Sequence, residues 1–548
     1  MADATFDVVM VGGGTKALPC ALYLAGYGGM SVAVVEREHE CGGGWCSTDY
    51  GGFYAAPHSM AHAYWYHSMP DMDFPGINAE VEWVAAEISQ AVIFKEDQHA
   101  ICLYYIDYDP TGDRTYETVR RYSERDAETL ITFRNWYHYV YRDAFLADAW
   151  SLPPPPGEPT ALEKLMAHPE IARSLDPGLY AMSIAQFCRT LFEHPAMQNF
   201  FLRSACASGI LPDDEGMGLF APFASFNIMD LGGSCRGSPH SPAHVYVRRL
   251  AGHGAKIFTH CEVEKILVES GRARGVRLTD GTEIEARKAV VTTLDPHQVV
   301  FRLLGKEMVS PYIRTKIAAL QRFRNCLCWY SWYMKERPQY LAGADNPELN
   351  NNSIFQIVMT DMDVDAQLRE AAYRRLGQNP PEVTLLNTNF STFDTHWTPP
   401  GTSYHAGLTE AYMAPADRYS DTEWIEHAKR HADYVVKTWG EYAPNVTWDN
   451  VFMYDPCTPW HTAKRLKNMA PTGSWSVVDL VPAQAGIRNR PIPELANHRV
   501  PEIKNLYCTG TAWGFYPGAS SCQGYTCYKA IAEDMGLRKP WEEQGRPY

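Results

Sequence analysis

The amino-acid sequence predicts an α/β fold in which one domain is assembled from segments that lie far apart in the chain. Three observations lead to this prediction. A glycine-rich turn joins an apolar strand to a helix within residues 7–25, short hairpin strands occupy residues 256–291, and a strand–turn–helix pattern lies at residues 505–535. With 548 residues, the chain is long enough for two domains, each with its own core.

The first segment has the pattern of a Rossmann-type dinucleotide-binding unit. The strand at 7–11 leads into Gly12-Gly13-Gly14-Thr15-Lys16-Ala17, a helix follows, and a second strand ends at Glu36. Gly12 permits the tight turn, Gly14 lets the backbone approach a pyrophosphate, and Ala17 allows close helix packing. The Glu36 carboxylate favours the ribose of FAD or NAD over NADP. The predicted cofactor-binding residues of this segment are Gly12, Gly14, Thr15, Lys16, Ala17, Glu36 and Arg37.

The two later segments are predicted to complete the same domain. Asp280-Gly281 separates two alternating strands, which is a strong signal for a β hairpin, and the apolar run at 289–291 is predicted to return to the parallel sheet. The last strand ends at Gly510, and a helix begins near residue 523. The turn between them offers backbone amides and a helix N-terminus to an anion. We therefore predict cofactor contacts from Gly510, Gly518, Ala519 and Ser520.

These segments lead to a prediction of domain boundaries. An FAD-binding domain is expected to comprise residues 1–75, 225–305 and 495–548, and a mixed α+β substrate-binding domain is expected to comprise residues 76–224 and 306–494. Residues 115–150 have helical periodicity, and the prolines at 153–156 end that region. The high density of His, Tyr and Trp at residues 53–75 predicts either a cavity wall or a core.

Composition excludes several classes of partner. The formal net charge of -15 argues against nucleic acid or an anionic membrane surface as the main partner. No stretch of 18 apolar residues predicts a transmembrane segment, and no secretory signal precedes the first strand. Under those conditions the 14 cysteines predict reduced thiols in a cytoplasm. No CxxC pair is present, so no metal site is predicted.

Taken together, these motifs resemble the phytoene desaturase and carotenoid isomerase branch of the FAD-dependent oxidoreductases, which is related to the amine oxidases. The matching blocks are the turn at 12–17 with Glu36, the glycines at 42–44, residues 232–233 with the following hairpins and 292–296, residues 399–401, and the run at 505–510. The resemblance implies bound FAD, with a backbone group of Val263 near the adenine. It also implies that the glycine stretch lies against the cofactor, through Gly43, Gly44 and Trp45.

Two departures from the family pattern bear on the substrate. The last turn reads Pro517-Gly518-Ala519-Ser520 where the family usually has several glycines, and bulky residues precede it. The substrate regions are also rich in Tyr and Trp. Both features favour a compact pocket for a small or ring-shaped substrate over one for a long polyene.

In this family the flavin accepts a hydride, and the protein positions the substrate and excludes water. The residues predicted to transfer protons near the flavin include His58, His62 and Tyr64, because His titrates near neutrality and Tyr can relay a proton. Tyr516 is a further catalytic candidate, which could pack over the flavin ring or gate access to it. For each of them a role in the core is the alternative. Arg488 and Arg490 are candidates for binding a substrate carboxylate, with a surface role as the alternative.

The leading functional hypothesis is an FAD-dependent oxidoreductase that desaturates or oxidises an apolar unsaturated small molecule, such as a terpenoid, alicyclic or aromatic compound. The electron acceptor is not identified by the sequence. One alternative is non-redox chemistry on reduced FAD, as in carotenoid isomerases and 2-haloacrylate hydratase. A second alternative is a flavin-binding subunit of a larger complex, and a homo- or hetero-oligomer is compatible with each hypothesis.

Overall fold

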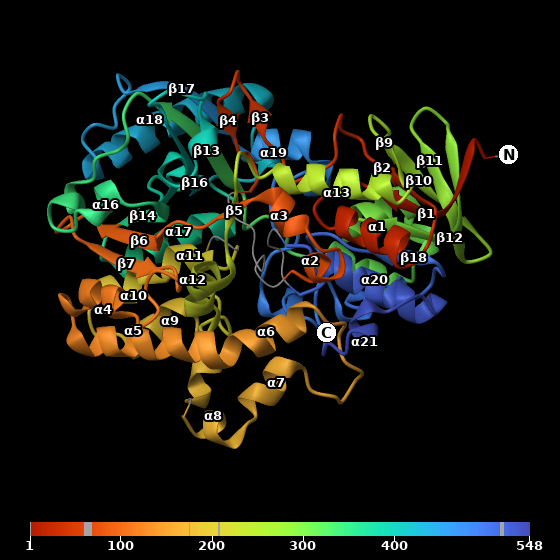
Figure 1. The fold of residues 1–548 in the computed structure, drawn as a ribbon, viewed down its shortest axis with the longest axis horizontal. Helices are drawn as coiled ribbons and strands as arrows, with labels where there is room; N and C mark the ends of the chain where they lie inside the picture. Colours follow the sequence, from red (N-terminus) through yellow and green to blue (C-terminus); the bar gives the residue numbers. More distant parts are fainter. Residues whose placement is uncertain (1, 60–67, 175, 207–208, 516–519) are drawn as a thin grey trace.

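The computed structural model describes residues 2–59, 68–174, 176–206, 209–515 and 520–548, and it contains two large β-sheets (Figure 1). In the first sheet, five strands run parallel in the order β9-β2-β1-β12-β18. Strands β10 and β11 extend this sheet as an antiparallel meander that pairs with the beginning of β12. The bounds are β1 Ala4–Val11, β2 Val32–Val35, β9 Lys256–Phe258, β10 Val263–Glu269, β11 Arg272–Leu278, β12 Glu283–Thr292 and β18 Leu506–Cys508.

Alternating residues of β1 explain why this sheet is covered on both faces. Val8 and Met10 pack with helices α1 (Ala17–Gly26), α13 (Ser241–Gly252) and α20 (Cys522–Met535). Val9 and Val11 point to the other face, where the meander and the π-helical turn Val299–Leu304 supply the apolar partners. Strands buried on both faces are typical of parallel sheets, which explains the continuous apolar runs.

The second sheet has the strand order β17-β13-β16-β15-β14-β6-β7. Its one face packs against α18 (Asp421–Tyr442), and its other face packs against helices that include α11 (Leu202–Cys206) and α12 (Phe220–Leu231). Because both faces are covered, β13, with the sequence LCWYSWYM, is buried at every position. The bounds are β6 Ile88–Phe94, β7 Ala100–Tyr104, β13 Leu327–Met334, β14 Ile354–Thr360, β15 Leu385–Thr388, β16 His405–Tyr412 and β17 Val451–Cys457.

The predicted helical region also forms. Helices α4 (Asp113–Arg120), α5 (Glu124–Trp136) and α6 (Arg142–Ala149) follow one another, with a π-helical turn joining α5 to α6 (Figure 1). The turn at Asp280-Gly281 joins β11 to β12, as predicted. No helix among the described residues is long and apolar enough to cross a membrane.

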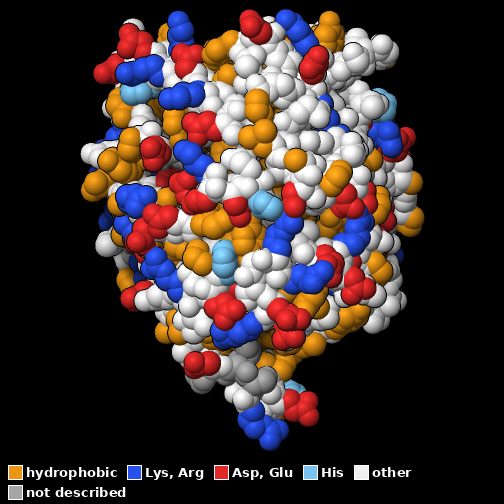
Figure 2. All heavy atoms as spheres, turned by 90° about the vertical axis from the view of Figure 1, so that its left-hand side faces the viewer, with side chains coloured by type: hydrophobic (Ala, Val, Ile, Leu, Met, Phe, Trp, Pro, Cys, Tyr) orange, Lys and Arg blue, Asp and Glu red, His pale blue; other side chains and the backbone are white. Residues whose placement is uncertain are grey.

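The α/β fold class is confirmed, with a parallel sheet assembled from distant segments. The strands of the first sheet lie within residues 1–75, 225–305 and 495–548, and those of the second lie within residues 76–224 and 306–494. The domain boundaries themselves stay a prediction. Figure 2 shows acidic and basic side chains interspersed over the face of the molecule that it presents.

Candidate functional site

A cavity runs from the glycine-rich turn of the first sheet to the surface of the second sheet. One end is lined by the C-terminal ends of β1, β2, β12 and β18, and the other end is lined by residues of β13, β14 and β16. Ligands of open parallel sheets bind at the carboxyl ends of the strands. The predicted cofactor residues that line this cavity are Gly12, Gly14, Thr15, Lys16, Glu36, Arg37, Gly43, Gly44, Val263 and Gly510.

The turn at residues 12–14 and Gly43 form a cradle at one end of the cavity, where segments of the chain approach each other closely. Gly12 has a φ of +92°, and a Cβ atom at this position would lie 2.4 Å from Thr293 Oγ1. A Cβ atom on Gly43, whose φ is +56°, would lie 3.0 Å from the Cα of Gly14. Any side chain here would strain the backbone and push the two loops apart. The residues therefore fit a dinucleotide whose pyrophosphate approaches bare backbone.

Glu36 is held in place by the backbone of the turn. Its Oε2 accepts a hydrogen bond from Gly13 N at 2.7 Å, and its Oε1 accepts one from Glu38 N at 2.9 Å. A carboxylate has further lone pairs for ligand hydroxyl groups, so it can also accept hydrogen bonds from a ribose. Arg37 lines the cavity and donates to the carbonyl oxygen of Arg465.

Lys16 places a cationic side chain at the phosphate end of the cavity. It is only 4% exposed, and burial lowers its pKa to about 8, with Cys522 opposing this shift and Arg490 adding to it. Burial disfavours the charged form of a lysine, and an anionic ligand in the cavity would favour it. The side chain is therefore suited to respond to the charge of a bound phosphate.

His58 is the predicted catalytic residue that the structure places in the cavity wall. Its Nε2 lies 3.0 Å from Thr462 Oγ1, and its Nδ1 lies 3.5 Å from Cys46 Sγ. Burial, with Arg465 and His461 nearby, lowers the pKa of His58 to about 3. The imidazole is therefore neutral near pH 7, so it can exchange hydrogen bonds but carries no positive charge.

The other predicted residues lie elsewhere. Ala17 is buried at the start of α1, Trp45 stacks on Tyr246, and Ser520 contacts Cys522 and Gln523. None of these three is among the residues that line the cavity. The residues predicted at this site that lie outside the described part of the chain are His62, Tyr64, Tyr516, Gly518 and Ala519.

The arginine hypothesis requires a correction. Arg490 is fully buried and donates to the backbone carbonyls of Ser476, Val478 and Thr511. Arg488 donates to the carbonyls of Pro154 and Glu158. Both guanidinium groups thus hold segments of the chain together, and neither lines the cavity.

The distal end of the cavity contains polar residues that the sequence analysis missed. Trp329 and Glu410 lie directly opposite each other on β13 and β16, and both line the cavity. Glu410 forms a buried ion pair with Arg203 of α11, with 3.1 Å between Oε1 and the guanidinium nitrogen. Burial raises the pKa of Glu410, although Arg203 opposes the shift. The sequence signal was a charged residue inside the apolar run HAGLTEAY.

The remaining distal residues combine apolar and amide groups. Ala224 and Ile228 of α12 line the cavity together with Asn227 of the same helix and Gln356 of β14. Ser204 of α11 also faces it and donates to Gln90 Oε1 at 2.7 Å. A mostly apolar wall with a few placed polar groups is typical of a small-molecule site.

Comparisons with known proteins agree with this geometry. The sequence is 26% identical over 564 residues to a subunit of limonene dehydrogenase from Castellaniella defragrans, and the match covers 98% of this chain and 96% of that protein. An oxidoreductase from Methanosarcina mazei superposes with a TM-score of 0.58 at 14% identity, covering 96% and 99% of the two chains. Putrescine oxidase bound to putrescine superposes with a TM-score of 0.55 at 12% identity, covering 97% and 99%. No family model matches the chain.

The fold and the cavity thus define an α/β protein with the architecture of these oxidoreductases. The limonene dehydrogenase subunit and this chain are similar in sequence over nearly the whole length of both proteins. The structural likeness shows that the chain shares the fold of these oxidoreductases. A specific relation to phytoene desaturase stays a prediction.

Proposed function

We propose that the protein is an FAD-dependent oxidoreductase that acts on an apolar unsaturated small molecule. The observation that carries this proposal is the continuous cavity, which joins the glycine-rich turn of the first sheet to a pocket on the second sheet. A substrate in the distal pocket would lie beside the reactive end of a cofactor whose pyrophosphate occupies the cradle.

The cradle residues divide the contacts to FAD. The backbone at Gly12 and Gly14, the N-terminus of α1 and Lys16 would hold the pyrophosphate, since helix N-termini favour anions. Glu36 would accept hydrogen bonds from the ribose, and Val263 would lie near the adenine. Gly44 and Gly510 would border the other end of the cofactor. When bound, the flavin supplies hydride transfer, and the chain supplies position, exclusion of water and proton transfer.

The distal pocket supports a cyclic or otherwise compact hydrocarbon as substrate. Trp329, Ala224 and Ile228 offer an apolar wall, and the relative in the sequence comparison is named for a dehydrogenase of limonene. Glu410 is a titratable side chain in that part of the wall, so we assign to it the acceptance or donation of a proton. Its pairing with Arg203 holds the carboxyl group in one orientation.

A second polypeptide is the third part of the proposal. The relative is named as one subunit of its enzyme, and it matches this chain over nearly its full length. We therefore propose that the chain works as the flavin-binding subunit of a hetero-oligomer. The partner would pass electrons to an acceptor that the chain does not identify.

Product analysis tests this function. The purified protein, oxidised in one series and chemically reduced in the other, is incubated without oxygen with cyclic terpenes, other alicyclic compounds and 2-haloacrylates. Oxidised or desaturated product from the oxidised protein supports the proposal. Product that forms only from the reduced protein, without net oxidation, would instead establish an isomerase or hydratase. Absence of FAD from the purified protein would contradict both.

A further inference from the structure

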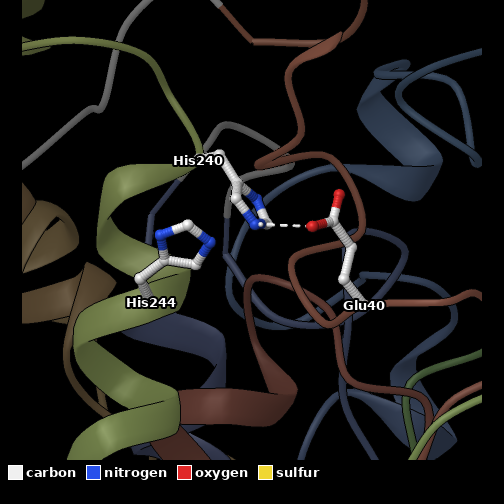
Figure 3. Close-up of side chains that lie close together, drawn as sticks. All are labelled: Glu40, His240 and His244. Atoms are coloured by element: carbon white, nitrogen blue, oxygen red, sulfur yellow. Dashed lines mark ion pairs between the residues drawn. The ribbon is translucent and has the colours of Figure 1, made fainter. Parts of the chain in front are cut away.

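Three side chains meet outside the cavity, at the joint between the glycine-rich loop and helix α13. His240 and His244 are one helical turn apart at the start of α13, and Glu40 comes from the loop that follows β2 (Figure 3). One ligand atom of each residue lies within 4.8 Å of the others. Two histidines at positions i and i+4 with a carboxylate are a ligand set that Zn²⁺ uses in proteins.

The hydrogen bonding of His240 prepares it for metal coordination. Its Nδ1 contacts the carbonyl oxygen of Trp45, which can only accept, so the hydrogen of a neutral ring is on Nδ1. The lone pair of Nε2 then faces Glu40, whose Oε2 is 3.2 Å away. Metal-binding histidines usually donate their second ring N–H to a carboxylate, a backbone carbonyl or a water, and the Trp45 carbonyl is such an acceptor.

When the His240 ring is neutral, a cation between Nε2 and the Glu40 carboxylate satisfies two groups that otherwise face each other without a shared proton. His240 is 5% exposed, and its Nε2 is buried without a hydrogen-bond partner among the described residues. A lone pair directed at a carboxylate is repulsive, and a buried polar atom without a partner costs free energy. A cation between Nε2 and the Glu40 carboxylate removes both penalties.

The distances between the three ligand atoms agree with a tetrahedral site after a small movement of the His244 side chain. Zinc–ligand bonds of about 2.0–2.1 Å place neighbouring tetrahedral ligands about 3.3 Å apart, which is close to the 3.2 Å between His240 and Glu40. His244 is exposed, so its side chain can move toward the other two ligands at low cost. Figure 3 shows the two imidazole rings side by side on α13, with Glu40 across from His240.

We propose that Glu40, His240 and His244 bind a divalent transition metal ion, with Zn²⁺ as the chemical type and water in the remaining position. The site would fasten α13 to the loop at 40–45, because Glu40 begins that loop and the carbonyl of Trp45 ends it. Gly43 and Gly44 of the same loop line the cofactor cavity. The metal would therefore stabilise the junction between α13 and this loop, and no cysteine takes part.

Zinc affinity tests the proposal. Protein freed of metal with a chelator is titrated with Zn²⁺ in competition with a chromophoric chelator, and the melting temperature is recorded with and without Zn²⁺. The variant is His244→Gln, because an exposed side chain can be replaced without disturbing the fold. His253→Gln is the control, since His253 is an exposed histidine just past the end of the same helix.

The proposal predicts one tightly bound Zn²⁺ per wild-type chain, and a melting temperature that Zn²⁺ raises. His244→Gln is expected to weaken that affinity at least tenfold and to lose the thermal shift, while His253→Gln behaves as the wild type. Equal affinity in wild type and His244→Gln, or no bound Zn²⁺ in the wild type, would overturn the proposal. Both readouts are independent of flavin and of enzymatic activity.

Discussion

Trp329 and Glu410 are direct cross-strand neighbours on β13 and β16, and both face the cavity that begins at the glycine-rich turn. The pair places an aromatic surface beside a buried carboxyl group, which forms an ion pair with Arg203. This relationship gives the distal pocket both a wall for an apolar ring and a group that can exchange a proton.

The first prediction concerns Glu410. Glu410→Gln keeps an oxygen acceptor for Arg203 but removes the titratable group, so the rate of flavin reduction by substrate should fall on the order of 100-fold or more, the usual contribution of a general acid or base. The FAD content should be unchanged. Stopped-flow absorbance under anaerobic conditions measures both quantities.

Glu441→Gln, on the exposed side of α18, is the matched control and should reduce flavin at the wild-type rate. An unchanged rate in Glu410→Gln would remove the proton-transfer role. Glu410→Ala is a less suitable variant, because a buried arginine left without its partner costs about 3–5 kcal/mol of stability.

The second prediction concerns the cradle. Gly43→Ala requires a side chain at a φ of +56° and at 3.0 Å from the Cα of Gly14. We expect the free energy of unfolding to fall by about 1–2 kcal/mol and the affinity for FAD to fall at least tenfold. Fluorescence titration of the cofactor-free protein with FAD measures the affinity.

Gly252→Ala is the control for this substitution, because no atom outside the backbone of its own helix and its chain neighbours lies within 4 Å of the added Cβ, and the φ is not positive. It should bind FAD like the wild type. If Gly43→Ala binds FAD equally well, the close approach of the two loops does not shape the cofactor site.

The third prediction concerns Lys16, whose replacement should stabilise the cofactor-free protein but weaken the binding of FAD. Its folded-state pKa of about 8 lies below the unfolded value of 10.5, so the unfolded chain binds more protons between these pH values. The stability of the cofactor-free protein should therefore rise as pH increases from about 8 to 10.5, and the penalty is fully present below pH 8. Lys16→Met should stabilise the cofactor-free protein at pH 7 by up to about 3 kcal/mol and weaken FAD binding.

Lys529 also has a pKa that burial lowers to about 8, so it contributes to the pH dependence of stability in both proteins. The difference between the wild type and Lys16→Met therefore isolates the contribution of Lys16. Urea unfolding at pH 7 and pH 10 gives the stability difference for each protein. A variant that is less stable than the wild type at pH 7 would contradict the proposed burial penalty.

The fourth prediction concerns acid stability. Burial lowers the pKa of His58 to about 3, so the unfolded chain takes up a proton between pH 6.5 and 3 that the folded chain does not. Stability should therefore fall as the pH decreases through this range, by up to about 1.4 kcal/mol per pH unit for one histidine. His58→Gln should reduce the slope, which thermal unfolding at pH 7, 6 and 5 can measure. His405, His431 and His498 share the direction of this shift, so the slope should decrease without disappearing.

The sequence predicted the part of the site that depends on local patterns. The turn at Gly12, the acid Glu36 and the strand that ends near Gly510 belong to strand–turn–helix units, which short-range spacing reveals. The distal pocket could not be predicted this way, because Glu410 and Arg203 are 207 residues apart and meet only when β16 packs against α11. Similarly, the spacing of His240 and His244 is visible in the sequence, but Glu40 joins them through tertiary packing.

Arg488 and Arg490 show the same limit of prediction from sequence. An arginine near a predicted cofactor segment suggests anion binding, yet Arg490 satisfies backbone carbonyls of three separate segments. Sequence proximity to a site does not tell whether a guanidinium group points into the cavity or holds its wall.

The central claim is that one cavity brings a flavin and an apolar unsaturated substrate together. The most direct measurement is the visible absorbance of the purified, flavin-loaded protein during anaerobic titration with a cyclic terpene. The account predicts that the visible bands of the oxidised flavin bleach in proportion to the added substrate. The titration is repeated with the other alicyclic compounds and in the presence of the co-purifying partner. A flavin spectrum that stays unchanged with all of these compounds would contradict the account.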